Sequence, residues 1–152
     1  VAIPTIPGID DTRQITVRAV STTLPGKSLE QLTWEGHGVK LHFAGKMSFD
    51  ETWELTLIEA RDNKTRDMIS TWIDNARSWL SNSGSYKSEY AVPISLTLLD
   101  SKGTDLRDVQ LVNAFPTQLG QATLDQGTGI VNYQVTFSFD YAVETPAVTT
   151  SN

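Results

Sequence analysis

Few side chains in this sequence have the types and spacing that catalysis or metal binding requires. Gly26-Lys27-Ser28 resembles the end of a phosphate-binding loop, but that motif needs a glycine five positions earlier, where the chain has Ser21. The two histidines, His37 and His42, are five residues apart, so a straight strand would place them on opposite faces. A catalytic zinc ion also needs a third protein ligand, and none is obvious nearby. We therefore expect neither a phosphate site nor a metal site.

The other polar clusters are better explained by turns. Residues 83–85, Ser-Gly-Ser, lack the Gly-x-Ser-x-Gly elbow of a serine hydrolase. Residues 100–105 lack the alternating oxygen ligands of a calcium loop, and residues 127–129 lack the third glycine of a dinucleotide fingerprint. Because the chain has no cysteine, disulfides and cysteine nucleophiles are excluded. These observations favour a binding or assembly role without a cofactor, and an enzyme is the weakest alternative.

The composition narrows the class of protein further. A chain of 152 residues fits one domain that can bury a real core. No apolar run approaches the roughly 20 residues that span a bilayer, so we expect no membrane insertion. The first residues have no basic region typical of a secretory signal. The net charge is −6 and the 12 basic residues are scattered, which disfavours tight binding to phosphate backbones.

The N-terminal third predicts extended structure. Residues 1–12 contain two prolines and a glycine, which indicates an extended arm without helix. Residues 13–20 alternate polar and apolar side chains, which predicts a half-buried strand before the turn at 24–26. Residues 34–50 predict a hairpin or a long loop with a strand on its return. Residues 53–57 predict a strand that carries two polar side chains opposite its apolar face, Glu54 and Thr56.

One amphipathic helix is predicted over residues 63–82. Asp62 or Asn63 can cap its N-terminus, and Asn82-Ser83-Gly84 is a plausible stop. Its apolar stripe has helical spacing, which suits packing on a sheet. The predicted core residues of this helix are Met68, Ile69, Trp72, Ile73, Ala76, Trp79 and Leu80.

The C-terminal half predicts three strands, over residues 90–99, 106–115 and 130–141, with a turn at 100–103. The last strand would reach roughly 40 Å, which is long for a small domain. Such a strand is either central in its sheet or has an open edge meant for another subunit. Residues 143–152 are expected to be a polar tail. The last strand alternates strictly, and its polar face carries Asn132, Gln134, Thr136, Ser138 and Asp140.

The pattern as a whole predicts a mainly β domain over residues 13–142, a β-sandwich or partial barrel with one packed helix. Five segments appear in a characteristic order: residues 17–25, 44–57, 65–72, 113–120 and 133–141. They comprise a strand ending in a Leu-Pro turn, a loop leading into a Trp-bearing strand, the helix, an Asn-Ala-Phe-Pro segment and the terminal strand. In order and spacing they resemble the tail tube protein family of contractile-tailed phages (myoviruses).

This resemblance implies a structural subunit whose hexameric rings stack into a hollow tube. Strands would join between subunits into a closed ring barrel around the lumen. The implied partners are other copies of the chain, the tail sheath protein, the baseplate or tube initiator, and the tail terminator. The tape measure protein and DNA would occupy the lumen transiently. The implied location is the virion, assembled in the host cytoplasm.

The resemblance and the strand pattern together give two sets of candidate residues. The polar faces of two strands would line the lumen: Glu54, Thr56, Asn132, Gln134, Thr136, Ser138 and Asp140. The arm and the loop at 34–50 would contact neighbouring subunits or the next ring through Ile3, Ile6, Asp10, Asp11, Trp34, His37, Lys40, His42, Lys46 and Asp50.

Two alternatives remain open. The same conduit could serve an R-type bacteriocin or a contractile injection or secretion system. A monomeric β-sandwich binding module is the second alternative, and it would use exposed aromatic side chains such as Trp34 and Tyr86.

Overall fold

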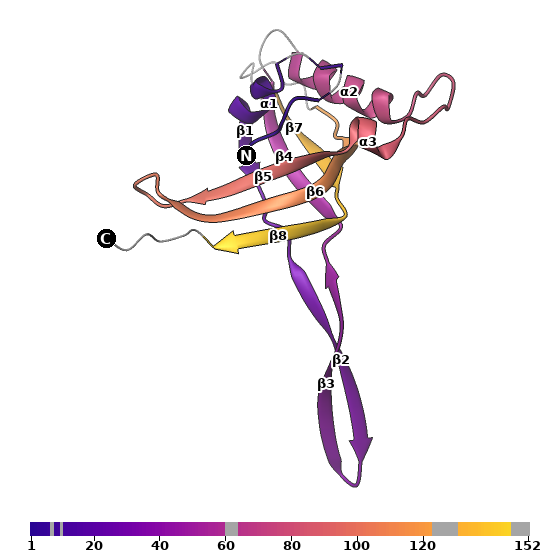
Figure 1. Ribbon diagram of the computed structural model, residues 1–152, viewed down its shortest axis with the longest axis vertical. Helices are drawn as coiled ribbons and strands as arrows, with labels where there is room; N and C mark the ends of the chain where they lie inside the picture. The colour runs from indigo at the N-terminus through magenta and orange to yellow at the C-terminus, as the bar shows by residue number, and fades with distance from the viewer. Residues whose placement is uncertain (7, 10, 60–63, 123–130, 147–152) are drawn as a thin grey trace.

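The computed structural model describes residues 1–6, 8–9, 11–59, 64–122 and 131–146. It shows a curled antiparallel sheet with helices at one end and one long hairpin that projects away from it (Figure 1). The predicted mainly β fold with a packed helix is therefore confirmed. In chain order the elements are α1 (Arg13–Val17), β1 (Ala19–Thr22), β2 (Lys27–Gly36), β3 (Val39–Phe49), β4 (Thr52–Glu59), α2 (Lys64–Ala76), α3 (Lys87–Tyr90), β5 (Val92–Leu99), β6 (Asp105–Leu119), β7 (Val131–Ser138) and β8 (Tyr141–Pro146).

The sheet has the order β1-β4-β7-β6-β5, and β8 also pairs with β6. The long strand β6 joins the two halves of this sheet. Its residues 115–119 pair with β7, whereas residues 107–112 pair with β8. On its other edge, β6 pairs with β5. Because β6 takes part in both halves, the sheet curls into a partial barrel.

The core lies between the curled sheet and α2. Trp53 of β4 and Phe137 of β7 pack with their rings tilted and their centroids 5.0 Å apart, and Trp72 of α2 meets Phe137 edge-on at 5.7 Å. All three side chains are fully buried. The Trp72 indole N–H donates to the Tyr90 carbonyl at 2.7 Å, so its one polar atom is satisfied. Full burial of each such side chain contributes roughly 1.5–3 kcal/mol.

The predicted helix is shorter than expected. It ends at Ala76, and the chain then turns back so that Arg77 forms a bridge with Gly84. Trp79 and Leu80 are 78% and 79% exposed, so their assignment to the core was wrong. Within the predicted stop at 82–84, Asn82 takes a left-handed conformation, with φ +53°. Serine side chains compete with helical hydrogen bonding, and in the segment that follows the helix the Ser81 and Ser83 hydroxyls lie 2.7 Å apart.

Some predicted strands were also wrong in their bounds. Residues 13–20 begin with the helical turn α1 and become a strand only at Ala19. The predicted strand 130–141 bends after Ser138, and the chain resumes as β8, which extends into the expected polar tail. The bend lets the chain follow the curl of β6, since the Asp140 N–H donates to the Val112 carbonyl. The strand expected at 90–99 begins only at Val92, because Tyr90 ends α3, whereas the turn at 100–103 is confirmed, with Gly103 at φ +79°.

The N-terminal arm packs against its own domain. Ile3, Ile6 and Ile9 are buried in the core. Ala2 exchanges two backbone hydrogen bonds with Ser95 of β5, at 2.7 and 3.0 Å, and so covers part of the edge of that strand. The prediction that Ile3 and Ile6 contact other subunits is therefore wrong, because their side chains are used within the chain.

The hairpin formed by β2 and β3 continues from β1 and β4 but extends beyond the sheet (Figure 1). It starts at Lys27, earlier than the expected position 34. At its base the Asp50 N–H donates to the Gly26 carbonyl, and the Gly26 N–H donates to the Asp50 carboxylate. A side chain at Gly26 would place Cβ 2.7 Å from that carboxylate, so glycine permits this close contact at the base of the hairpin.

In the part of the chain described, no helix is long and apolar enough to cross a bilayer.

Candidate assembly surfaces

One face of β4 and β7 carries almost all the predicted lumen residues. The two strands pair with Glu54 opposite Thr136, and Thr56 opposite Gln134. Directly opposed residues project to the same side of a sheet, so these four side chains share the face that points away from the core. The Gln134 amide donates to the Glu54 carboxylate at 2.7 Å.

The same face extends further in both directions. Asn132 and Ser138 belong to it by their alternation in β7. Gln118 of β6 lies opposite Thr136, and Ser21 of β1 lies opposite Thr56. Sequence reasoning missed Gln118 because the predicted strand stopped at Phe115, before a proline and a bulge. We call the set Ser21, Glu54, Thr56, Gln118, Asn132, Gln134, Thr136 and Ser138 the polar face; Glu54 is its one charged residue.

Asp140 is separate from the polar face. It follows β7 at the bend, and its carboxylate accepts hydrogen bonds from Lys87 Nζ at 2.5 and 2.7 Å and from the Asn113 amide at 2.7 Å. The hydrogen bond from Lys87, and then that from Asn113, lower the pKa of Asp140 below its ordinary value. This carboxylate ties α3 to the bend between β7 and β8.

The distal part of the hairpin has one apolar and one polar face. Trp34 lies opposite Leu41, and Leu32 lies opposite Phe43, so these four side chains gather on one side. Each remains 45–54% exposed. The Trp34 ring lies over Gly36, where an added Cβ would be 2.3 Å from it. This set, which we call the hairpin apolar face, has no covering element among the described residues.

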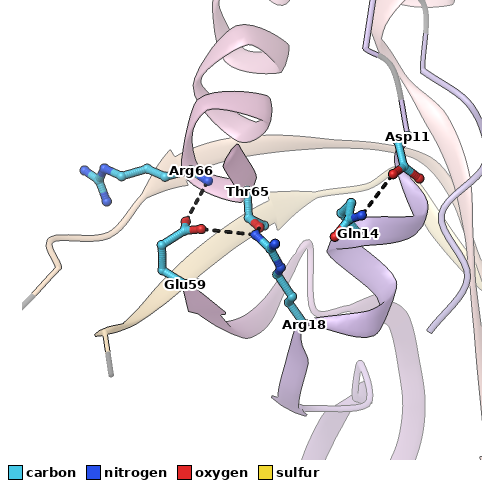
Figure 2. Close-up of polar contacts among 6 residues, drawn as sticks. All are labelled: Asp11, Gln14, Arg18, Glu59, Thr65 and Arg66. Carbon is cyan, nitrogen blue, oxygen red and sulfur yellow. Dashed lines mark hydrogen bonds and ion pairs between the residues drawn. The ribbon is translucent and has the colours of Figure 1, made fainter. Parts of the chain in front are cut away.

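The opposite side of the hairpin is polar. Lys40 forms an exposed ion pair with Glu35 at 3.5 Å, and His42 lies 3.3 Å from the Thr33 hydroxyl. Of the other predicted contact residues, Lys46 is exposed on β3 and His37 occupies the turn with φ +51°. The remaining three lie elsewhere: Asp50 at the hairpin base, Asp11 accepting from Gln14 beside α1 (Figure 2), and Asp10 outside the described residues.

A buried ionic cluster that the sequence did not reveal anchors α2 to the sheet (Figure 2). Arg18 contacts Glu59 at 3.2 Å and the Thr65 hydroxyl at 2.5 Å. The Arg66 backbone N–H donates to the other oxygen of Glu59 at 2.9 Å. Only 15% of the Arg18 side chain and 6% of the Glu59 side chain are exposed. Burial, and then the charge of Glu59, raise the pKa of the nearby Tyr133 hydroxyl above its ordinary value, so the phenol stays neutral.

Two strands of the curled sheet have an unpaired edge within the described residues. β1 pairs only with β4, and β8 pairs only with β6. Glu144 of β8 contacts Arg107 at 3.1 Å and Lys27 at 3.8 Å, which places β8 beside the base of the hairpin. Exposed strand edges can pair with another chain.

These features define an assembly protein built on a curled sheet. In the described part of the chain, no group of three or more His, Cys, Asp or Glu residues could hold a metal ion. The family model for the phage tail tube protein matches residues 3–144. The chain therefore belongs to the phage tail tube protein family, and it is a structural tail tube subunit.

Individual relatives agree with this assignment. The tail tube protein of Serratia phage KSP90 is 30% identical over 117 residues, which cover 76% of this chain and 66% of the relative. A chain of the sheath and tube terminator of PVC, an extracellular contractile injection system, has a TM-score of 0.59 at 21% identity, covering 82% of this chain and 83% of that chain. A chain of the anti-feeding prophage baseplate has a TM-score of 0.61 at 11% identity, covering 84% and 80%. At these identities the two structures show a shared fold.

Proposed function

We propose that this subunit forms hexameric rings that stack into a tube, and that the tube conducts DNA inside a contractile sheath. The observation that carries this proposal is a curled sheet with two edges that are unpaired among the described residues and with the polar face, whose one charged residue is Glu54. In a closed ring, strands of neighbouring copies would satisfy the open edges of β1 and β8. Membership of the tail tube family supports the same arrangement.

The polar face would line the lumen. Its amides and hydroxyls do not attract phosphates as lysines do, so DNA would slide without being retained. Asp140 is not needed for this role, since it is engaged with Lys87 and Asn113.

The lumen assignment is tested by Glu54→Lys, with Asp105→Lys as a control for the same charge change at the exposed start of β6. Tubes of both variants should assemble. Only Glu54→Lys should slow DNA passage, and added salt should relieve the effect because the retention is electrostatic. Equal DNA delivery by the two variants would refute a lumen position for Glu54.

The hairpin would reach the next ring or a neighbouring subunit. Its apolar face is half exposed, and an isolated two-stranded hairpin is at best marginally stable in water. An apolar patch of this kind on a protein surface marks an interaction site. Contact with another copy would cover the patch and rigidify the hairpin.

The partners and location follow from this role. We infer a virion component, assembled in the host cytoplasm, that acts with sheath, baseplate and terminator proteins and has no catalytic activity. The tape measure protein would occupy the lumen before DNA. The fold shared with chains of contractile injection systems keeps a bacteriocin or injection-system tube as a second candidate.

Electron microscopy and sedimentation of the purified chain test the assembly itself. Rings or tubes that form above a threshold concentration are the expected result. A compact single-copy species at every concentration would overturn the proposal and would instead favour a monomeric binding module.

A further inference from the structure

The loop after α2 holds two large apolar side chains in solvent. Residues 77–84 are tied together by the Arg77–Gly84 bridge, by a hydrogen bond from Arg77 Nε to Asn82 Oδ1 at 2.7 Å, and by the Ser78–Ser83 backbone bond at 3.0 Å. These bonds give the loop a defined shape. Trp79 and Leu80 nevertheless contact little of their own chain, since more than three quarters of each residue is exposed.

A pocket lies along the first two turns of the same helix, where the N-terminal arm crosses it. Its volume is about 250 Å³. The lining residues are Gly8, Ile9, Lys64, Asp67, Met68 and Thr71. Ligand pockets usually begin at about 300 Å³, so this pocket suits one aromatic side chain rather than a cofactor.

The pocket chemistry matches an indole. Ile9 and Met68 provide an apolar wall, and Met adapts well to aromatic partners. Asp67 is exposed at the pocket and can accept a hydrogen bond from an indole N–H. Gly8 keeps the arm close to the helix, because a Cβ there would lie 3.2 Å from the Asn75 side chain.

We propose that Trp79 of one copy inserts into the pocket beside Met68 of the next copy. The loop leaves the C-terminal end of α2, whereas the pocket lies along its N-terminal half, so a chain cannot fill its own pocket while its loop keeps this shape. A projection and a pocket at different places on one molecule make a head-to-tail contact, which repeats from copy to copy. The proposal rests on the self-assembly proposed above and specifies one contact within it.

Engineered cysteines can detect this contact directly, because the chain has none of its own. Leu80→Cys marks the loop and Thr71→Cys marks the pocket; both positions are exposed, so neither change should disturb the core. Assembled mixtures of the two single variants should give covalent dimers with a short bismaleimide. The double variant should give a ladder of covalent oligomers. Lys102→Cys, at the exposed β5–β6 turn, replaces Leu80→Cys in the control mixture and should not cross-link to Thr71→Cys.

A second measurement tests the role of the aromatic side chain of Trp79. Trp79→Ser should raise the concentration at which tubes form by at least tenfold, whereas Trp79→Phe should stay within a few fold of the wild type. Tubes that form normally without cross-links above the control would overturn this contact and leave the proposed function intact. Cross-links that need added sheath protein would also overturn it. Failure of the unmodified chain to assemble at all would instead overturn the proposed function.

Discussion

The hairpin apolar face offers the sharpest test of assembly. The perturbation is the triple substitution Leu32→Ser, Leu41→Ser and Phe43→Ser, which leaves Trp34 as a fluorescent reporter. These three side chains keep 45–54% of their surface exposed in the single chain. Full burial of such a side chain is worth about 1.5–3 kcal/mol, so covering the remaining half contributes about 1 kcal/mol for each. The triple variant should therefore lose about 2–4 kcal/mol of assembly free energy per subunit.

This loss corresponds to an increase of about 30- to 1,000-fold in the threshold concentration for tube formation. Pelleting of tubes across a concentration series measures that threshold. The matched control is Thr33→Ala with His42→Ala, on the opposite face of the same hairpin, where the threshold should change little. An equal shift in both variants would show that the hairpin folds less well rather than docks less well. An unchanged threshold in the triple variant would refute the docking role of the apolar face.

Three further predictions concern the fold that carries these surfaces. Phe137→Ala should lower the free energy of unfolding by about 3–5 kcal/mol, measured by urea denaturation, because the ring is fully buried between two tryptophans. Arg18→Met should cost about 3–5 kcal/mol in the same assay because it leaves Glu59 buried beside fewer donors, and adding Glu59→Gln should recover part of the loss. Since Lys87 lowers the pKa of Asp140, the stability that their contact provides is present above about pH 4, the ordinary carboxyl pKa, and is lost as the pH falls through the lowered pKa. Lys87→Met should therefore be less stable than the wild type at pH 7, and this gap should narrow as the pH falls below about 4; a gap that did not narrow on acidification would contradict this.

The strands were the most predictable part of the fold. Alternation correctly placed Tyr133, Val135 and Phe137 in the core and their polar neighbours on the other face. A period of two fixes which face a side chain occupies, but it does not fix where a strand bends. The break at Asp140 depends on bonds to Lys87 and Val112, which are distant in sequence.

For the helix, the periodicity of the sequence predicted too long an element. The spacing of Trp79 and Leu80 continues the apolar stripe of Trp72 and Ala76, so periodicity alone extends the helix through them. The chain instead leaves the helix at Ala76, because the serine-rich segment that follows forms its own turn. In the N-terminal arm, the prolines correctly indicated an extended chain, but spacing could not show that Ile3 and Ile6 enter the core.

The surfaces that would make a single chain prone to aggregation are the ones that an assembly would use. Open edges on β1 and β8, the hairpin apolar face and the exposed Trp79 would each promote aggregation in a protein that acts alone. Proteins that work as monomers usually protect such edges with charges, bulges or covering segments. This chain does cover the edge of β5 with its N-terminal arm. Since the arm covers part of one edge while the edges of β1 and β8 are open among the described residues, we infer that the open ones are retained for specific pairing between copies.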